Sequence, residues 1–211
     1  MTIDTHHHIL PDFFWRETNS PHAPVGGLAP LQWSKEAMIS FMDEAGIDVA
    51  VMSVSTPGVH IGDSQRARSL ARRCNELAAE LVHERPDRFA SFACIPLPDI
   101  DASLEELSYA LDVLGLDGLV LFTNSNGVYL GDTSLEPVFE ELDLIRGPGA
   151  IARHGAVPEA REDGVGISAH VVVRPEVEDE VHVEPVVLAE ERLDVVLEAR
   201  QDAAADRKSV V

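Results

Sequence analysis

The last third of this 211-residue chain has no aromatic side chain. Every Phe, Trp, Tyr, Met and Cys lies within residues 1–143, as does every Thr and Asn. A segment without these residues lacks the large side chains that dominate packed cores. We therefore divide the chain into an ordinary part, residues 1–143, and an atypical tail, residues 144–211, that we expect to be poorly ordered.

Positive charge is also scarce. The chain has 16 Lys and Arg against 37 Asp and Glu, a formal net charge of −21. Such an acidic surface repels nucleic-acid phosphates and anionic membranes, so we expect neither as a partner.

The chain has few cysteines and no long apolar run. Cys74 and Cys94 both sit in apolar segments, which predicts buried free thiols of a reducing compartment. No apolar run reaches the roughly 18 residues of a membrane span, and no secretory leader opens the chain. We expect a cytoplasmic protein. Neither G-x-G-x-x-G nor G-K-[ST] occurs, which argues against a nucleotide-binding fold.

What the sequence does have is a run of histidines near its start, in the stretch I-D-T-H-H-H-I-L. If this stretch is a strand, alternation places Asp4, His6 and His8 on one face and His7 on the other. Two imidazoles on one rigid face make half of a metal site, and Asp4 would either orient a ligand or bind the metal itself. A purification tag and a purely structural role for the histidines are the alternatives.

Strand and helix patterns alternate four times before residue 143. The expected strands are 2–8, 47–54, 89–97 and 118–123, and the expected helices are 34–45, 63–85, 103–114 and 132–142. This alternation predicts a parallel α/β sheet or barrel. Because a full barrel takes about 250 residues, we predict the N-terminal half of a (β/α)8 TIM barrel, with the histidines where strand 1 ends.

The segment 11–34 is rich in Pro and Gly but carries four aromatic residues. We interpret it as an irregular lid or wall beside the histidines; simple packing on the barrel rim is the alternative. Trp15 and Trp33 from this segment, and Asn124 after the fourth strand, are candidate substrate contacts because of their positions.

Four segments in order resemble one family, the amidohydrolase-related (amidohydrolase 2) branch of the metal-dependent hydrolases, which includes aminocarboxymuconate-semialdehyde decarboxylase and resorcylate-type decarboxylases. The resemblance lies in D-T-H-H-H-I-L-P at 4–11, M-D-E-A-G-I-D at 42–48, D-R-F-A with I-P-L-P at 87–98, and L-G-D with L-E-P-V at 130–138.

The resemblance implies a barrel that binds one divalent metal, commonly zinc, through His6 and His8. It further implies hydrolysis or non-oxidative decarboxylation of a small carboxylated or cyclic substrate. In the family, two more histidines and an aspartate complete the metal site from later strands. Here His154 follows no clean strand, and His170 and His182 precede apolar stretches instead of ending them. We therefore expect the site to be incomplete.

Two other functions stay open. The chain would be an inactive fragment with at most a weak two-histidine metal site, or another H-x-H barrel such as a TatD-type or PHP-type hydrolase. The tail composition also favours the hypothesis of a shifted reading frame in GC-rich DNA. A half barrel leaves the edges of strands 1 and 4 unpaired, which predicts self-association.

Overall fold

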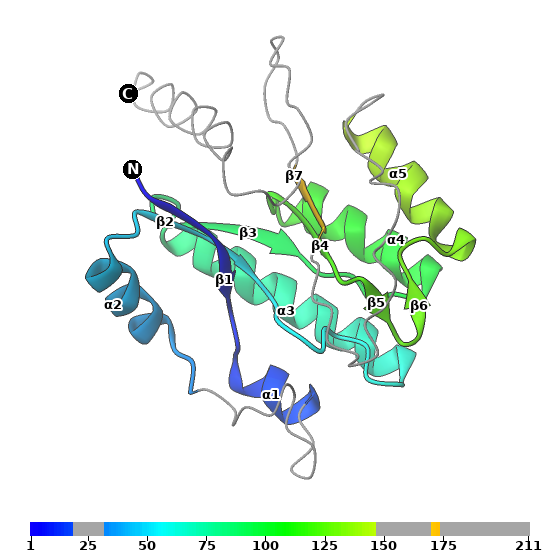
Figure 1. Cartoon of the computed structure of the whole chain (residues 1–211), viewed down its shortest axis with the longest axis horizontal. Coiled ribbons are helices and arrows are strands. Elements are labelled where there is room, and N and C mark those ends of the chain that lie inside the picture. The colour runs from blue at the N-terminus through cyan, green and yellow to red at the C-terminus, as the bar shows by residue number, and fades with distance from the viewer. Residues whose placement is uncertain (19–31, 147–169, 174–211) are drawn as a thin grey trace.

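The computed structural model describes residues 1–18, 32–146 and 170–173 (Figure 1). The predictions for His154 and His182, for the origin of the tail and for the order of most of it fall outside these residues. So does most of the segment interpreted as a lid.

Four parallel strands form a curled half barrel, as the alternating pattern predicted. The strands are β1 (Ile3–His8), β2 (Val49–Ser53), β3 (Phe89–Ala93) and β4 (Gly118–Leu121). They are hydrogen-bonded in chain order, and β2, β3 and β4 are buried at every position. Strands buried on both faces are typical of a parallel sheet covered by helices.

Helices follow each strand, most of them where the sequence predicted. They are α2 (Lys35–Ala45), α3 (Ser64–Glu84), α4 (Ile100–Ser108), continued by the π-helical turn η2 (Tyr109–Val113), and α5 (Glu136–Arg146), preceded by the 3-10 turn η3 (Thr133–Leu135). The ends of α2 and α3 agree with the expected ranges: the Ser34 and Asp63 side chains accept from backbone N–H groups of the first turns, and Gly46 ends α2 in the left-handed conformation at φ 69°.

Two local predictions were wrong. The segment after β1 is not irregular throughout, because α1 (Asp12–Thr18) begins directly after Pro11, whose carbonyl accepts from Phe14 and Trp15. The expected start of the third helix at residue 103 is also wrong, because α4 begins at Ile100. The side chain of Asp99 caps this helix, and Ser103 lies buried inside it.

After β4 the chain makes a short hairpin of β5 (Asn124–Ser125) and β6 (Val128–Tyr129). Its turn residues Asn126 and Gly127 have φ of 51° and 87°. An Asn-Gly pair readily adopts positive φ at both positions, which a tight two-residue hairpin turn requires.

The edge of β4 is not open. The strand β7 (His170–Val173), from the atypical tail, pairs antiparallel with β4, so that Leu121 lies opposite His170 and Gly118 opposite Val173. Figure 1 shows β7 as a short segment beside β4, at the opposite end of the sheet from β1. The prediction of an unpaired β4 edge is therefore wrong, because a distant segment pairs with it. β1 has no neighbour on its outer side in the part of the chain that the structure describes.

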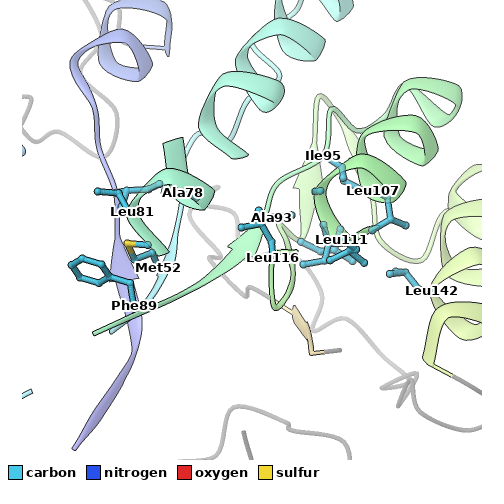
Figure 2. Packing of buried hydrophobic residues seen from close by; sticks show 14 of the residues in the cluster. Met52, Ala78, Leu81, Phe89, Ala93, Ile95, Leu107, Leu111, Leu116 and Leu142 are labelled. Atoms are coloured by element: carbon cyan, nitrogen blue, oxygen red, sulfur yellow. The ribbon is translucent and has the colours of Figure 1, made fainter. Parts of the chain in front are cut away.

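The larger hydrophobic cluster packs the sheet against its helices. Figure 2 shows Met52 and Phe89 of the sheet beside Ala78 and Leu81 of α3, and Leu107 of α4 toward Leu142 of α5. A second cluster joins α1 and α3 to the other side of the strands through Phe14, Leu70 and Val51. The short helix α1 is thus held by Phe14, which is fully buried.

Cys74 and Cys94 are free and buried, as predicted. Among the described residues, no helix is long and apolar enough to cross a bilayer. A cytoplasmic location stays a prediction.

Candidate metal centre at the end of β1

The register of β1 against β2 changes between the two ends of the histidine stretch. Asp4 lies opposite Ala50, but His7 lies opposite Met52 and His8 opposite Ser53. Three steps along β1 therefore match two steps along β2, which is the signature of a β-bulge with one extra residue. Since side chains alternate along β2, the bulge places Asp4 and His8 on opposite faces of the sheet.

The hydrogen bonds agree with this register. An oxygen of the Asp4 carboxylate lies 2.9 Å from Nδ1 of His7, and the other accepts from the His6 N–H at 3.0 Å. The prediction that Asp4 shares a face with His6 and His8 is wrong, because simple alternation does not hold across the bulge. Asp4 pairs with His7, the histidine that the sequence left without a role.

His6 and His8 do come together. Their Nε2 atoms are 3.0 Å apart and their rings meet edge to face, with centroids 4.7 Å apart. Two ring nitrogens at this distance repel each other through their lone pairs unless a proton or a cation lies between them. Zinc at 2.0–2.1 Å from each nitrogen needs a separation of about 3.3 Å at a tetrahedral angle, close to the observed value.

Ser53 at the end of β2 orients His8. Its hydroxyl lies 3.2 Å from Nδ1 of His8. A proton on Nδ1 shared with Ser53 leaves the Nε2 lone pair free and directed at His6. Burial, followed by the neighbouring charge of His6, lowers the pKa of His8 below its ordinary value of 6.5, which favours the neutral imidazole that a metal requires.

The residues therefore fit two positions of a divalent metal site. Within residues 1–18 and 32–146, no group of three or more His, Cys, Asp or Glu side chains is arranged to hold a metal. Two imidazoles alone leave at least two positions of a tetrahedral ion to other donors.

The three candidate substrate contacts have different surroundings. Trp15 and Trp33 are half-buried, and their indole N–H groups have no hydrogen-bond partner among the described residues. Asn124 is exposed, and its side-chain oxygen accepts from the N–H of Gly127 in the hairpin turn. A structural role in the hairpin therefore accounts for Asn124, whereas the two indole N–H groups are buried and unpaired within the described part of the chain.

A small hollow lies where β2, β3 and β4 end. Sequence reasoning gave no role to its lining, which includes His60, Cys94, Phe122 and Ser125. The ring of Phe122 packs against Gly58, where φ is 77° and an added Cβ would lie 3.1 Å from the ring. A side chain at position 58 would therefore be strained and would displace Phe122.

Residues 3–157 match the Amidohydro_2 family model, described as amidohydrolase. The chain belongs to the amidohydrolase family. The matched range contains β1 and its histidines, so the candidate metal site lies within the region that matches the family.

The curated relatives of this chain include decarboxylases. It is 38% identical over 148 residues to the decarboxylase macB of Penicillium terrestre, covering 67% of this chain and 44% of that protein. It is 34% identical over 138 residues to the gamma-resorcylate decarboxylase of a Rhizobium species, covering 65% of this chain and 38% of that protein. The chain thus spans less than half the length of these relatives.

Solved structures show the same fold. An amidohydrolase II crystal structure aligns with a TM-score of 0.65 at 28% identity, over 74% of this chain and 54% of that one. A dihydroxybenzoic acid decarboxylase from Polaromonas, with bound manganese and the inhibitor 2-nitroresorcinol, aligns with a TM-score of 0.51 at 28% identity, over 68% of this chain and 46% of that one.

Proposed function

We propose that this chain supplies the first two metal ligands of a non-oxidative decarboxylase for hydroxylated aromatic acids. The observation that carries the proposal is the convergence of His6 and His8, whose Nε2 atoms are 3.0 Å apart at the end of β1. The names of the relatives favour decarboxylation over hydrolysis, since they act on aromatic carboxylic acids.

Each residue has a defined task in this proposal. His6 and His8 would hold the ion, and Ser53 would keep His8 in the tautomer that leaves Nε2 free. A divalent metal bound there supplies a Lewis acid that polarises a carboxylate or phenolic oxygen of the substrate. The indole N–H of Trp15 or Trp33, without a partner among the described residues, is a candidate donor to the same substrate.

The metal is the next part of the proposal. The resemblance implies zinc, and a related decarboxylase binds manganese. Imidazole nitrogens bind zinc more tightly than manganese in the general order of divalent-metal affinity. We therefore propose that this chain binds Zn²⁺ more tightly than Mn²⁺.

The test combines metal binding with turnover. Calorimetric titration of the purified chain with Zn²⁺ and Mn²⁺ is followed by an assay of CO₂ release from 2,6-dihydroxybenzoate. We expect stoichiometric binding that His6→Ala abolishes and that His83→Ala, which removes an exposed histidine of α3, leaves unchanged. A wild-type chain that binds neither ion would overturn the proposed metal centre.

A second candidate function is metal binding without catalysis. It is favoured by the absence of a three-ligand group within residues 1–18 and 32–146. Metal binding that depends on His6 but is accompanied by no CO₂ release would select this candidate. CO₂ release that requires both His6 and added metal would reject it.

A further inference from the structure

The carboxylate of Asp4 contacts two residues of the bulge in β1, one through each oxygen. Asp4 accepts a hydrogen bond from the backbone of His6 through Oδ1 and contacts the ring of His7 through Oδ2. We propose that Asp4 is a positioning residue that sets the register of β1 and thereby decides to which face of the sheet His6 and His8 point. Its effect on metal binding rests on the proposed function, but its effect on the register does not.

The register shows what the bulge achieves. In a regular strand that starts from the pairing of Asp4 with Ala50, His8 would lie opposite Val54 instead of Ser53. A shift of one residue sends every following side chain to the other face of the sheet. His6 and His8 would then point to the face of Ala50 and Met52, which belongs to the main hydrophobic cluster with Met42 of α2.

The first contact of Asp4 satisfies the backbone. A bulge leaves its extra residue outside the strand ladder, so a backbone N–H loses its partner. The His6 N–H donates to Oδ1 of Asp4 at 3.0 Å, which replaces that partner locally. Asp side chains commonly bond the backbone two residues ahead in this way.

The second contact fixes the direction of the neighbouring side chain. Oδ2 of Asp4 lies 2.9 Å from Nδ1 of His7, and the two side chains are 27% and 11% exposed. With His7 held on the Asp4 side, beside the ring of Phe41 at 6.2 Å between centroids, His8 must point to the Ser53 side. The strand alternation that failed across the bulge holds again beyond it.

The test compares three variants of the full chain. Asp4→Ala removes both contacts. Asp4→Asn keeps an oxygen for the His6 N–H and an amide that donates to the other tautomer of His7. Asp48→Ala is the matched control, because the Asp48 carboxylate also accepts from a backbone N–H, that of Thr2 at 2.6 Å, but this contact lies just before β1 and outside the bulge.

The first measurement needs no metal. NMR cross-relaxation between the His8 ring and Ser53, and between the rings of His7 and Phe41, reports the register directly. We expect both signals in the wild type, Asp4→Asn and Asp48→Ala, and neither in Asp4→Ala. Wild-type signals in Asp4→Ala would overturn the proposal.

The second measurement is Mn²⁺ affinity. We expect Asp4→Ala to weaken it by roughly 10–100-fold, the usual effect of losing a group that orients a ligand, and Asp4→Asn to restore it. An Asp4→Asn variant with intact ring signals but the same loss as Asp4→Ala would identify Asp4 as a metal ligand and overturn its positioning role. If the wild type binds neither Mn²⁺ nor Zn²⁺ but the ring signals behave as expected, the proposed function fails and the register inference stands.

Circular dichroism shows whether Asp4→Ala folds. If it does not, Asp4→Asn alone tests the role of Asp4 in the register of β1. The proposal then requires the His8–Ser53 signal in Asp4→Asn, and its loss in that folded variant contradicts the proposal.

Discussion

The side chain of Asn75 exchanges two hydrogen bonds with the backbone of Cys94. Its Nδ2 donates to the Cys94 carbonyl at 2.9 Å, and the Cys94 N–H donates to its Oδ1 at 2.9 Å. The same Nδ2 donates to the carboxylate of Glu106 at 2.8 Å. Asn75 therefore joins α3 to the end of β3 and to α4. Water cannot take over these hydrogen bonds, since only 1% of the residue is exposed.

Asn75→Ala is expected to lower the free energy of unfolding by about 3 kcal/mol, because it leaves buried backbone groups of Cys94 without partners. Urea denaturation of the full chain measures the loss. Glu80→Ala, at an exposed position of the same helix, is the control and should change stability by less than about 0.5 kcal/mol. Equal losses in both variants would contradict this role of Asn75.

We expect protonation of Glu106 to make the fold more stable in mild acid than it would be with Glu106 ionised at neutral pH. Burial raises its pKa above the ordinary value of 4.5, although hydrogen bonds from Asn75 and Arg72 act against the shift. The folded state therefore binds a proton more tightly than the unfolded state, and protonation stabilises the fold. The contribution is present below the unfolded pKa and is lost as pH rises through the folded pKa.

The measurement is the stability of the wild type relative to Glu106→Gln across this range. The difference should shift in favour of the wild type as the pH falls from 7 toward 4.5, because the amide does not titrate. A difference that stays constant, or that moves toward Glu106→Gln in acid, would contradict the raised pKa.

Asp99→Ala should lower the free energy of unfolding, measured by urea denaturation, by about 1 kcal/mol, because the Asp99 side chain caps α4 by accepting from the Ala102 N–H. The hydrogen bond from Arg68 lowers the pKa of Asp99. The stability that the ionised Asp99 side chain adds is therefore present above the unfolded pKa of the carboxyl and is lost as the pH falls through its folded pKa. Ser103→Ala is the informative control: the buried Ser103 hydroxyl has no partner among the described residues, so its removal should cost less than the loss of the cap.

Ser53→Ala should weaken metal binding by roughly 10–100-fold while leaving the fold intact, because His8 loses the group that fixes its tautomer. Ser55→Ala, two residues further along, removes a hydroxyl outside the contact and should bind metal as the wild type does. Calorimetric titration with Zn²⁺ compares the two variants. Equal affinity in both would show that His8 is oriented without Ser53.

Local sequence carried enough information for most of the fold. The strands β2, β3 and β4 are short apolar runs between turn residues, and α2 and α3 have side chains at Ser34 and Asp63 that cap them within one turn. These features depend on neighbours along the chain, so they could be predicted without knowing which strands pair. The convergence of His6 and His8 also follows from spacing, because residues two apart in a strand share a face.

What could not be predicted depends on pairing between distant segments. The place of Asp4 depends on the register of β1 against β2, and nothing in residues 3–8 alone shows that one of them is extra. The partner of β4 lies some fifty residues away in the tail, where composition argued against regular structure. The start of α4 at Asp99 was missed because Ser103, with Glu106 three residues later, has the S-x-x-E spacing that is also typical of a helix start.

The pairing of β7 with β4 changes how the barrel could be completed. In a closed (β/α)8 barrel the next parallel strand occupies the position that β7 holds here. Two strands cannot share one edge, so a fifth parallel strand could join only by displacing β7. Completion of the barrel would thus exchange one strand for another. Its equilibrium would depend on the difference in free energy between pairing β4 with β7 and pairing β4 with a fifth parallel strand.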